Sequence, residues 1–363
     1  MAYTTIDDPS VYFHTQLYTG DGASSNSITN DANAGDFKPD WLWVKNRTTG
    51  GGTGPNIVFD TTRGNTKDLH VNNIEAEHTN SNVLLSFDTD GFSVGTSGVV
   101  NNNTDNFVAW QWKANGGTTS SNSDGSITST VQANTTAGFS IVTWTGTGSD
   151  ATVGHGLSSA PEMYVVKNRS DSADWRVGQT VAGNTMTGGN GYYMEWNDTK
   201  ASTNPGSAVT WGSTPTAPTS SVFTVGSNNA HNGSSDNMLA YCFHSVQGYS
   251  KISSYTGNGN EDGPFVYTGF KPQWILFKNT GAAEEWVLQD TTRNPNNPVT
   301  KNIRIDSNIA EADASNIDID FLSNGFKNRS DQAQVNSNGV VYIYMAFAEN
   351  PFVSSKGVPV TAR

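Results

Sequence analysis

The chain has 363 residues, a net charge of −13 at pH 7 and a single cysteine, and 34% of its residues are hydrophobic. An acidic chain is repelled by a phosphate backbone, so the charge argues against a nucleic-acid partner. One cysteine, Cys242, cannot form a disulfide within the chain, and its apolar neighbours indicate a buried small side chain.

The N-terminal residues lack a basic region followed by an apolar one, and the chain has no run of 18 apolar residues. We therefore expect no signal peptide, no membrane insertion and synthesis in a cytoplasm. Aromatic residues make up 10% of the chain, and there are 37 glycines. This mixture is typical of short strands joined by tight turns, because aromatic side chains fill thin β-cores.

In chain order, the first distinctive element is residues 39–46, in which a proline and a polar residue precede four apolar residues and a Lys-Asn pair. The same pattern returns at residues 161–168 and 272–279. An apolar run of this length, bounded by proline and polar residues, predicts a short strand that is buried on both faces. The chain is therefore a threefold internal repeat.

Each copy surrounds this strand with further strand-like segments. An aromatic-Thr-Gly-X-Gly turn precedes it, beginning at Tyr18, Trp144 and Tyr255. A long apolar strand closes each copy, at 107–112, 238–243 and 340–347. Asp60 with Arg63, and Asp290 with Arg293, recur in copies one and three, where we expect a local turn contact.

These patterns predict an all-β fold of three tandem antiparallel β-sandwich domains, of the jelly-roll or lectin-like kind, related by internal repeat. The expected divisions are repeat 1 at 1–113, a Gly/Ser/Thr/Asn-rich linker at 114–130, repeat 2 at 131–246, repeat 3 at 247–349, and an extended C-terminal tail at 350–363.

Several longer phrases carry a family resemblance: residues 18–22, 37–47, 124–157, 342–352 and 357–363. Together they resemble the repetitive virion proteins of marine tailed phages, which are tail-fibre-like and have concanavalin-like sandwich domains. The resemblance implies a structural protein of the virion, tail-associated as a fibre, tip or adaptor, that contributes to host-surface attachment. It implies no catalytic residue.

From this resemblance we expect a non-enzymatic protein located in the virion, with other virion proteins and a host cell-surface glycan as partners. We also expect a homo-oligomer, with a trimer as the working guess, although three similar domains in one chain could instead imitate a trimer. Three alternatives stay open: a head decoration or head-fibre protein, a polysaccharide-degrading enzyme, and a lectin. For the enzyme, the candidate carboxylate pairs are Glu75 with Glu77, Asp88 with Asp90, Glu284 with Glu285, and Asp318 with Asp320.

Copy two carries an insertion rich in aromatic, Asn and Gly residues, a composition typical of sugar-binding surfaces. Its candidate carbohydrate-binding residues are Tyr192, Tyr193, Trp196, Asn197 and Trp211, with core filling as the alternative. The recurrent positions that we interpret as structural are Trp41, Trp43, Lys45, Lys167, Trp274 and Lys278.

We expect no cofactor and no transition-metal ion, because the six histidines show no recognised metal-ligand spacing. Calcium in the loops of Asp21, Asp31 and Asp262 is left open as an alternative, since these loops offer hard oxygen ligands.

Overall fold

The computed structural model describes residues 4–31, 36–50, 54–182, 191–204, 210–313 and 316–348. Nearly all regular structure within them is β-strand, and the strands pair antiparallel. The predicted all-β fold is confirmed. The helices are single turns: η1 (Pro9–Val11), α1 (Gly98–Asn101) and α2 (Asn229–Asn232). The expected C-terminal tail lies outside the described residues.

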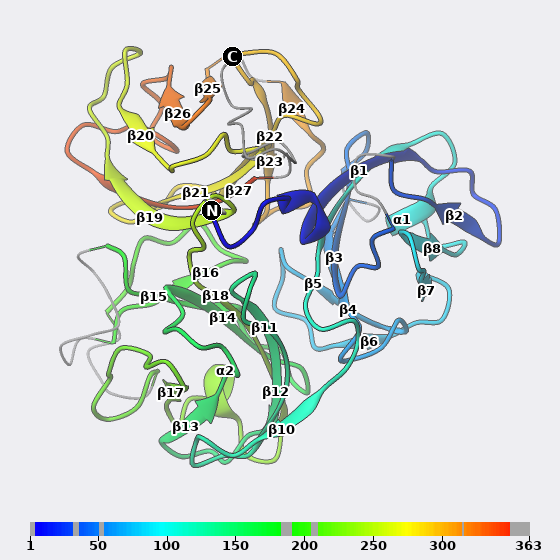
Figure 1. Ribbon diagram of the computed structural model, residues 1–363, viewed down its shortest axis with the longest axis vertical. Helices are drawn as coiled ribbons and strands as arrows, with labels where there is room; N and C mark the ends of the chain where they lie inside the picture. The colour runs from blue at the N-terminus through cyan, green and yellow to red at the C-terminus, as the bar shows by residue number, and fades with distance from the viewer. Residues whose placement is uncertain are drawn as a thin grey trace.

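Repeat one, from β1 to β9, contains a six-stranded sheet and a three-stranded sheet (Figure 1). In spatial order, the large sheet is β1 (Phe13–Thr19), β9 (Asn106–Trp112), β3 (Trp41–Asn46), β4 (Asn56–Asp60), β5 (Lys67–His70) and β6 (His78–Thr79). The small sheet is β2 (Asn26–Ile28), β8 (Phe92–Val94) and β7 (Leu84–Phe87).

Repeat two, from β10 to β18, has the same central order with two additional strands at one edge. Its large sheet is β10 (Ser120–Asn122), β11 (Ser129–Asn134), β12 (Phe139–Thr145), β18 (Asn237–Phe243), β14 (Met163–Asn168), β15 (Arg176–Gln179) and β16 (Met194–Glu195), and its small sheet is β13 (Ala151–Gly154) and β17 (Val222–Val225). The stretch expected to be a linker, 114–130, thus contains β10 and the start of β11, which pair with each other in this sheet.

Repeat three, from β19 to β27, repeats the order of repeat one. Its large sheet is β19 (Ser250–Thr256), β27 (Val341–Phe347), β21 (Trp274–Asn279), β22 (Val287–Asp290), β23 (Lys301–Arg304) and β24 (Ala312–Asp313), and its small sheet is β20 (Phe265–Tyr267), β26 (Gly325–Asn328) and β25 (Ile319–Leu322). The strands β3, β14 and β21 therefore hold equivalent positions, and they are the three copies of the repeated core strand.

Each repeat is a sandwich whose two sheets enclose a separate hydrophobic core. In repeat one, Leu42 and Val44 of the large sheet pack with Phe92 and Val94 of the small sheet. Repeats two and three have corresponding clusters around Tyr164 and Phe277, respectively. The small sheets thus cover only the outer face of each large sheet.

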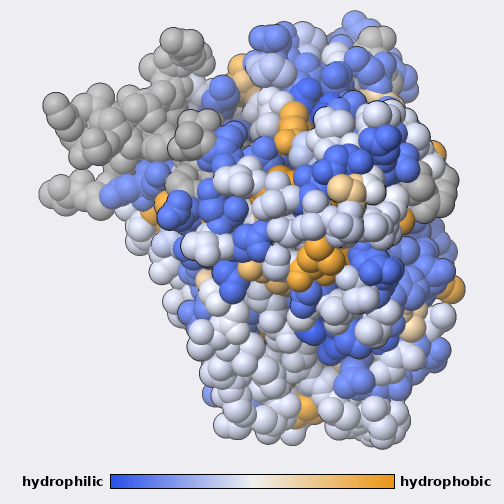
Figure 2. All heavy atoms as spheres, turned by 90° about the vertical axis from the view of Figure 1, so that its right-hand side faces the viewer, coloured by the Kyte–Doolittle hydropathy of each residue, from blue (hydrophilic) through white to orange (hydrophobic). Residues whose placement is uncertain are grey.

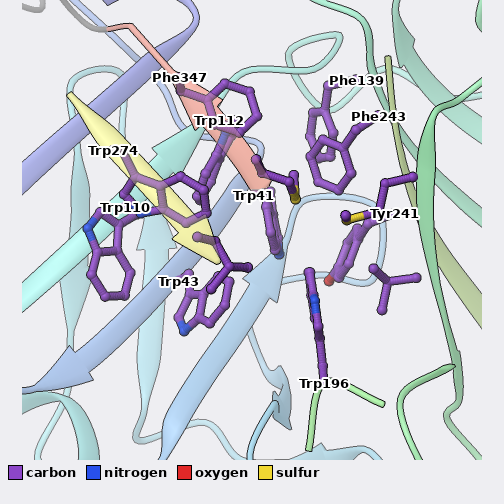
Figure 3. Packing of buried hydrophobic residues seen from close by; sticks show 14 of the residues in the cluster. Trp41, Trp43, Trp110, Trp112, Phe139, Trp196, Tyr241, Phe243, Trp274 and Phe347 are labelled. Atoms are coloured by element: carbon purple, nitrogen blue, oxygen red, sulfur yellow. The ribbon is translucent and has the colours of Figure 1, made fainter. Parts of the chain in front are cut away.

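The inner faces of the three large sheets share one further core. Because side chains alternate along a strand, Trp41 and Trp43 of β3 point away from Leu42 and Val44. They join a single cluster with Met163 and Val165 of β14 and with residues of β21, including Trp274. Figure 3 shows aromatic rings from all three repeats meeting there, with Trp41 between the rings of repeats two and three. The core strand is buried on both faces, as predicted, because one face lines its own sandwich and the other lines the shared core.

On the side of the molecule that carries repeat one, polar residues cover most of the surface and hydrophobic residues form small, separate spots (Figure 2). The large aromatic side chains are instead concentrated inside: Trp41, Trp43, Trp110, Trp112, Trp175, Trp196, Trp211, Trp274 and Trp286 are each less than 2% exposed. Each aromatic ring of this kind buries about 150–250 Å², so this interior contributes strongly to stability.

Candidate functional site

The most regular arrangement of polar groups lies where the repeats meet. In each repeat, one segment follows the strand that holds the same place in the large sheet, which is β5, β16 or β23, and this segment contacts the next repeat. We name residues 71–77, 196–202 and 305–311 the docking segments. The last residue of each donates its backbone N–H to a carbonyl of the neighbouring repeat. The bonds are Glu77 to Arg169 (2.9 Å), Ser202 to Thr280 (3.0 Å) and Glu311 to Arg47 (3.0 Å).

A second bond repeats at every junction and involves the residue immediately before each docking segment. Its carbonyl accepts a hydrogen bond from a side chain of the next repeat. The bonds are Trp175 Nε1 to His70 O (2.9 Å), Trp286 Nε1 to Glu195 O (2.7 Å) and Asn56 Nδ2 to Arg304 O (3.1 Å). Repeat one thus contacts two, two contacts three, and three contacts one, which is a closed ring of head-to-tail contacts.

The three repeated lysines are buried at these junctions. Lys167 Nζ donates to Ile74 O of repeat one (3.0 Å), and Lys278 Nζ donates to Thr199 O of repeat two (2.6 Å). Lys45 donates to Gly54 O of its own repeat. Burial lowers the pKa of Lys45 to about 7 and those of Lys167 and Lys278 to about 8, because desolvation disfavours the charged ammonium group. Their role is to satisfy backbone carbonyls.

Buried arginines reinforce two of the three junctions. Arg63 is paired with Asp60 (2.5 Å) and with Glu77 of its docking segment (3.0 Å), and Glu77 in turn binds Arg169 of repeat two (2.7 Å). Repeat three makes the same contacts to repeat one. There, Arg293 pairs with Asp290 (2.6 Å) and Glu311 (2.9 Å), and Glu311 binds Arg47 (2.9 Å). The recurrent Asp and Arg therefore form the expected turn contact and also anchor a docking segment.

The structure places Trp196 and Asn197, two of the candidate sugar-binding residues, at the start of a docking segment. Trp196 is 1% exposed and belongs to the shared core. Asn197 Oδ1 accepts from the backbone N–H of Trp175 (2.8 Å), as Asn72 does from Asn56 in repeat one (2.8 Å). Both residues occupy positions that recur structurally.

The other three candidates lie around the sandwich core of repeat two. Trp211 is fully buried, and its Nε1 donates to Tyr192 O (3.0 Å). The Tyr193 ring is half-buried, and the guanidinium of Arg176 covers it at 4.2 Å. The buried Trp196 and Trp211 rings therefore present no face to a sugar.

In each acidic pair considered for catalysis, one member is held by other side chains. Glu77 binds two arginines, and the pKa of its carboxyl is lowered: burial opposes this shift, but the hydrogen bond and charge of Arg169, with Arg63, outweigh it. Asp88 accepts hydrogen bonds from Ser86 (2.5 Å) and Ser93 (2.6 Å). Glu285 pairs with Arg304 (2.7 Å), and Asp320 pairs with Arg329 (2.6 Å).

One cluster that sequence analysis did not foresee is formed by Asp68, His70 and His78. Among the described residues, these three form the one group of histidine and carboxylate side chains whose potential ligand atoms lie within 4.8 Å of one another. Burial lowers the pKa of the His70 imidazole, while the nearby Asp68 carboxylate opposes that shift. A strand prediction that paired β5 with β6 would have brought Asp68 and His78 together.

Comparison with known proteins identifies a family for this chain. No curated protein matches the chain. In the described part of the chain, no helix has the length and apolar character needed to cross a bilayer. A protein-family comparison matches residues 8–351, a span that includes all three repeats and their junctions. The chain therefore belongs to the family described as a domain of unknown function (DUF7483).

Proposed function

We propose that this protein is a non-enzymatic structural component of a tailed-phage particle, associated with the tail as a tip or adaptor that contributes to host-surface attachment. The observation that carries the proposal is the closed ring of three repeats around one aromatic core. Such a ring is a rigid unit with approximate threefold symmetry. The recurrent buried Lys, Arg and acidic side chains join its repeats to one another. The resemblance of the repeated phrases to virion proteins supports the same role.

The threefold contact that we expected between separate chains is, in this proposal, made within one chain. Each docking segment contacts the next repeat, and the third contacts the first, so the ring has no open end at which another copy would add. One chain can then occupy a place of threefold symmetry on a particle. Because the repeats differ in sequence, their outer loops can contact different neighbours.

Attachment to a host glycan remains part of the proposal, but the residues proposed to bind the glycan are different ones. Trp196 and Trp211 are committed to two hydrophobic cores. Residues exposed at the outer surface must then make the contact. Tyr267 of repeat three is 66% exposed and lies next to Phe265, which is 46% exposed, on the outer sheet. Exposed aromatic rings of this kind supply the stacking faces that sugars require.

The test is to locate the protein on purified particles of the phage that encodes it, using a gold-labelled antibody raised against the recombinant chain. Labelling at the tail supports the proposal. Labelling spread over the head would replace the tail assignment with head decoration, and absence from particles that are otherwise complete would refute a virion role. A glycan-binding screen with the Tyr267→Ala variant as control then tests attachment separately.

A further inference from the structure

The β5–β6 hairpin of repeat one brings three ligand-type side chains together. Asp68 and His78 are direct partners across the antiparallel pair, and His70 lies two residues after Asp68 on the same face of β5. Asp68 Oδ2 lies 3.1 Å from His78 Nδ1 and 3.6 Å from His70 Nε2. Two ligands bound to zinc at about 2.0–2.1 Å in tetrahedral geometry are roughly 3.4 Å apart, so these spacings suit one shared ion.

The second ring nitrogen of each histidine faces another carboxylate. Glu75 Oε2 lies 3.4 Å from His70 Nδ1 and 3.8 Å from His78 Nε2. Metal-bound histidines commonly donate their remaining N–H to a carboxylate, which fixes the tautomer and the ring orientation. Asp68 therefore faces the nitrogens that would bind an ion. Glu75 lies on the opposite side of both rings, and at His70 Nδ1 it is joined by the amide of Asn73, whose Nδ2 is 3.3 Å away.

One oxygen of the Asp68 carboxylate has no partner, while the other lies beside the two histidines. Asp68 is 2% exposed, and its Oδ1 atom has no hydrogen-bond partner. A buried charge without sufficient partners is costly unless a cation accompanies it. His78 is 42% exposed at its side chain, so an ion and a water ligand can reach the cluster from solvent.

We propose that Asp68, His70 and His78 bind one divalent transition-metal ion, with zinc as the best fit to two imidazoles and one carboxylate. The protein supplies three ligands, and water supplies the fourth. The ion joins β5 to β6 at both ends of the first docking segment. Since His70 O accepts from Trp175 and Glu77 binds Arg169, the ion also holds the junction between repeats one and two.

The other repeats provide an internal comparison. In repeat three, the strand pairing places Asn302, Arg304 and Ala312 at the positions of Asp68, His70 and His78. In repeat two, Glu195 is at the position of His70. Among the described residues, this set of ligand side chains therefore occurs in repeat one alone, and we expect one ion per chain.

The experiment uses the full chain, freed of metal with a chelator and dialysed, and titrated with Zn²⁺ by calorimetry. We expect one equivalent to bind with micromolar or tighter affinity, and the melting temperature to rise. Co²⁺ in the same site should give the visible absorption of a four-coordinate ion. His78→Ala should weaken zinc binding at least 100-fold, because it removes a direct ligand at an exposed position.

His244→Gln serves as the matched histidine control and should bind zinc like the unmodified protein. Circular dichroism establishes that each variant is folded, and His78→Gln is a second variant of similar volume should the alanine variant unfold. The proposal is overturned if the unmodified chain does not bind zinc at 100 micromolar, or if folded His78 variants bind it as tightly as the unmodified chain does.

Discussion

Replacing Trp41 with alanine tests whether the three repeats unfold as one unit. Trp41 is 1% exposed, and its ring lies 4.6 Å from that of Tyr241 and 5.6 Å from that of Phe139, both in repeat two (Figure 3). The substitution removes a ring that holds two repeats together. Truncation of a buried tryptophan costs about 3–5 kcal/mol, and we take about 4 kcal/mol for this site.

The size of the resulting temperature shift depends on how much of the chain unfolds together. The entropy of unfolding is about 2.1 cal/mol/K per residue, or roughly 0.76 kcal/mol/K for the whole chain. A loss of about 4 kcal/mol then lowers the melting temperature by about 5 °C. If repeat one, of about 100 residues, unfolded alone, the same loss would lower its own transition by about 19 °C.

Differential scanning calorimetry separates the two cases. We expect one endotherm for the unmodified protein and one for Trp41→Ala, displaced by the smaller amount. The matched control is Trp211→Ala, which removes a fully buried ring from the core of repeat two alone and should displace the same single endotherm by a similar amount. Two resolved transitions in the unmodified protein, or a large shift of only one part of the trace, would refute a common cooperative unit.

Two further predictions concern buried charges at the junctions. Arg63→Met leaves Asp60 and Glu77 without their shared cation and should lower the free energy of unfolding, measured in urea, by about 3–5 kcal/mol. Arg329→Met, at an exposed ion pair, should lower it by about 0–1 kcal/mol. Equal losses of stability in the two variants would contradict this reasoning. The pKa of Lys45 is about 7 in the folded chain and about 10.4 when unfolded, so between these values the unfolded state binds more protons. The free energy of unfolding of the unmodified protein, minus that of Lys45→Met, should therefore rise with pH from about 7 to about 10, by at most about 1.4 kcal/mol per pH unit. A difference that does not change with pH would contradict a buried lysine that is neutral when folded.

The sequence was informative about strands and repetition. The pattern around Trp41, Met163 and Trp274 predicted a strand buried on both faces, and this is correct. It did not reveal that one face belongs to a core shared by three repeats. When both faces of a strand are apolar, the alternation that normally identifies the inner face is missing, so the pattern cannot tell two cores from one.

The role of the repeated Lys-Asn pair also depended on tertiary contacts. Asn46 Oδ1 accepts the backbone N–H groups of Thr48 (3.0 Å) and Thr49 (3.1 Å), and Asn168 and Asn279 form the same turn in their repeats. A turn of this kind is recognisable from sequence once the strand end is known. The acceptors that Lys167 and Lys278 find in the neighbouring repeat are not, because Ile74 and Thr199 lie on distant segments of the chain.

Local composition gave an incomplete picture of the candidate sites. Trp196 and Trp211 lie among Asn, Asp and Gly residues, which made their surroundings resemble a sugar-binding loop. Their burial follows from contacts with β-strands far away in sequence, including the ring of Trp43 at 5.5 Å from that of Trp196. Asp68, His70 and His78 were missed for the related reason that their spacing becomes a cluster only when β5 and β6 pair.

The most direct test of the closed ring is small-angle X-ray scattering on the protein as it elutes from a sizing column, with light scattering on the same peak. A compact particle of 363 residues has a radius of gyration of about 21 Å. Three separate domains in a row, each about 30 Å across, would give about 28 Å or more. We predict the smaller radius together with a mass near 38.8 kDa. The larger radius at that mass would contradict the closed ring, and three times the mass would contradict the proposal that one chain replaces a trimer.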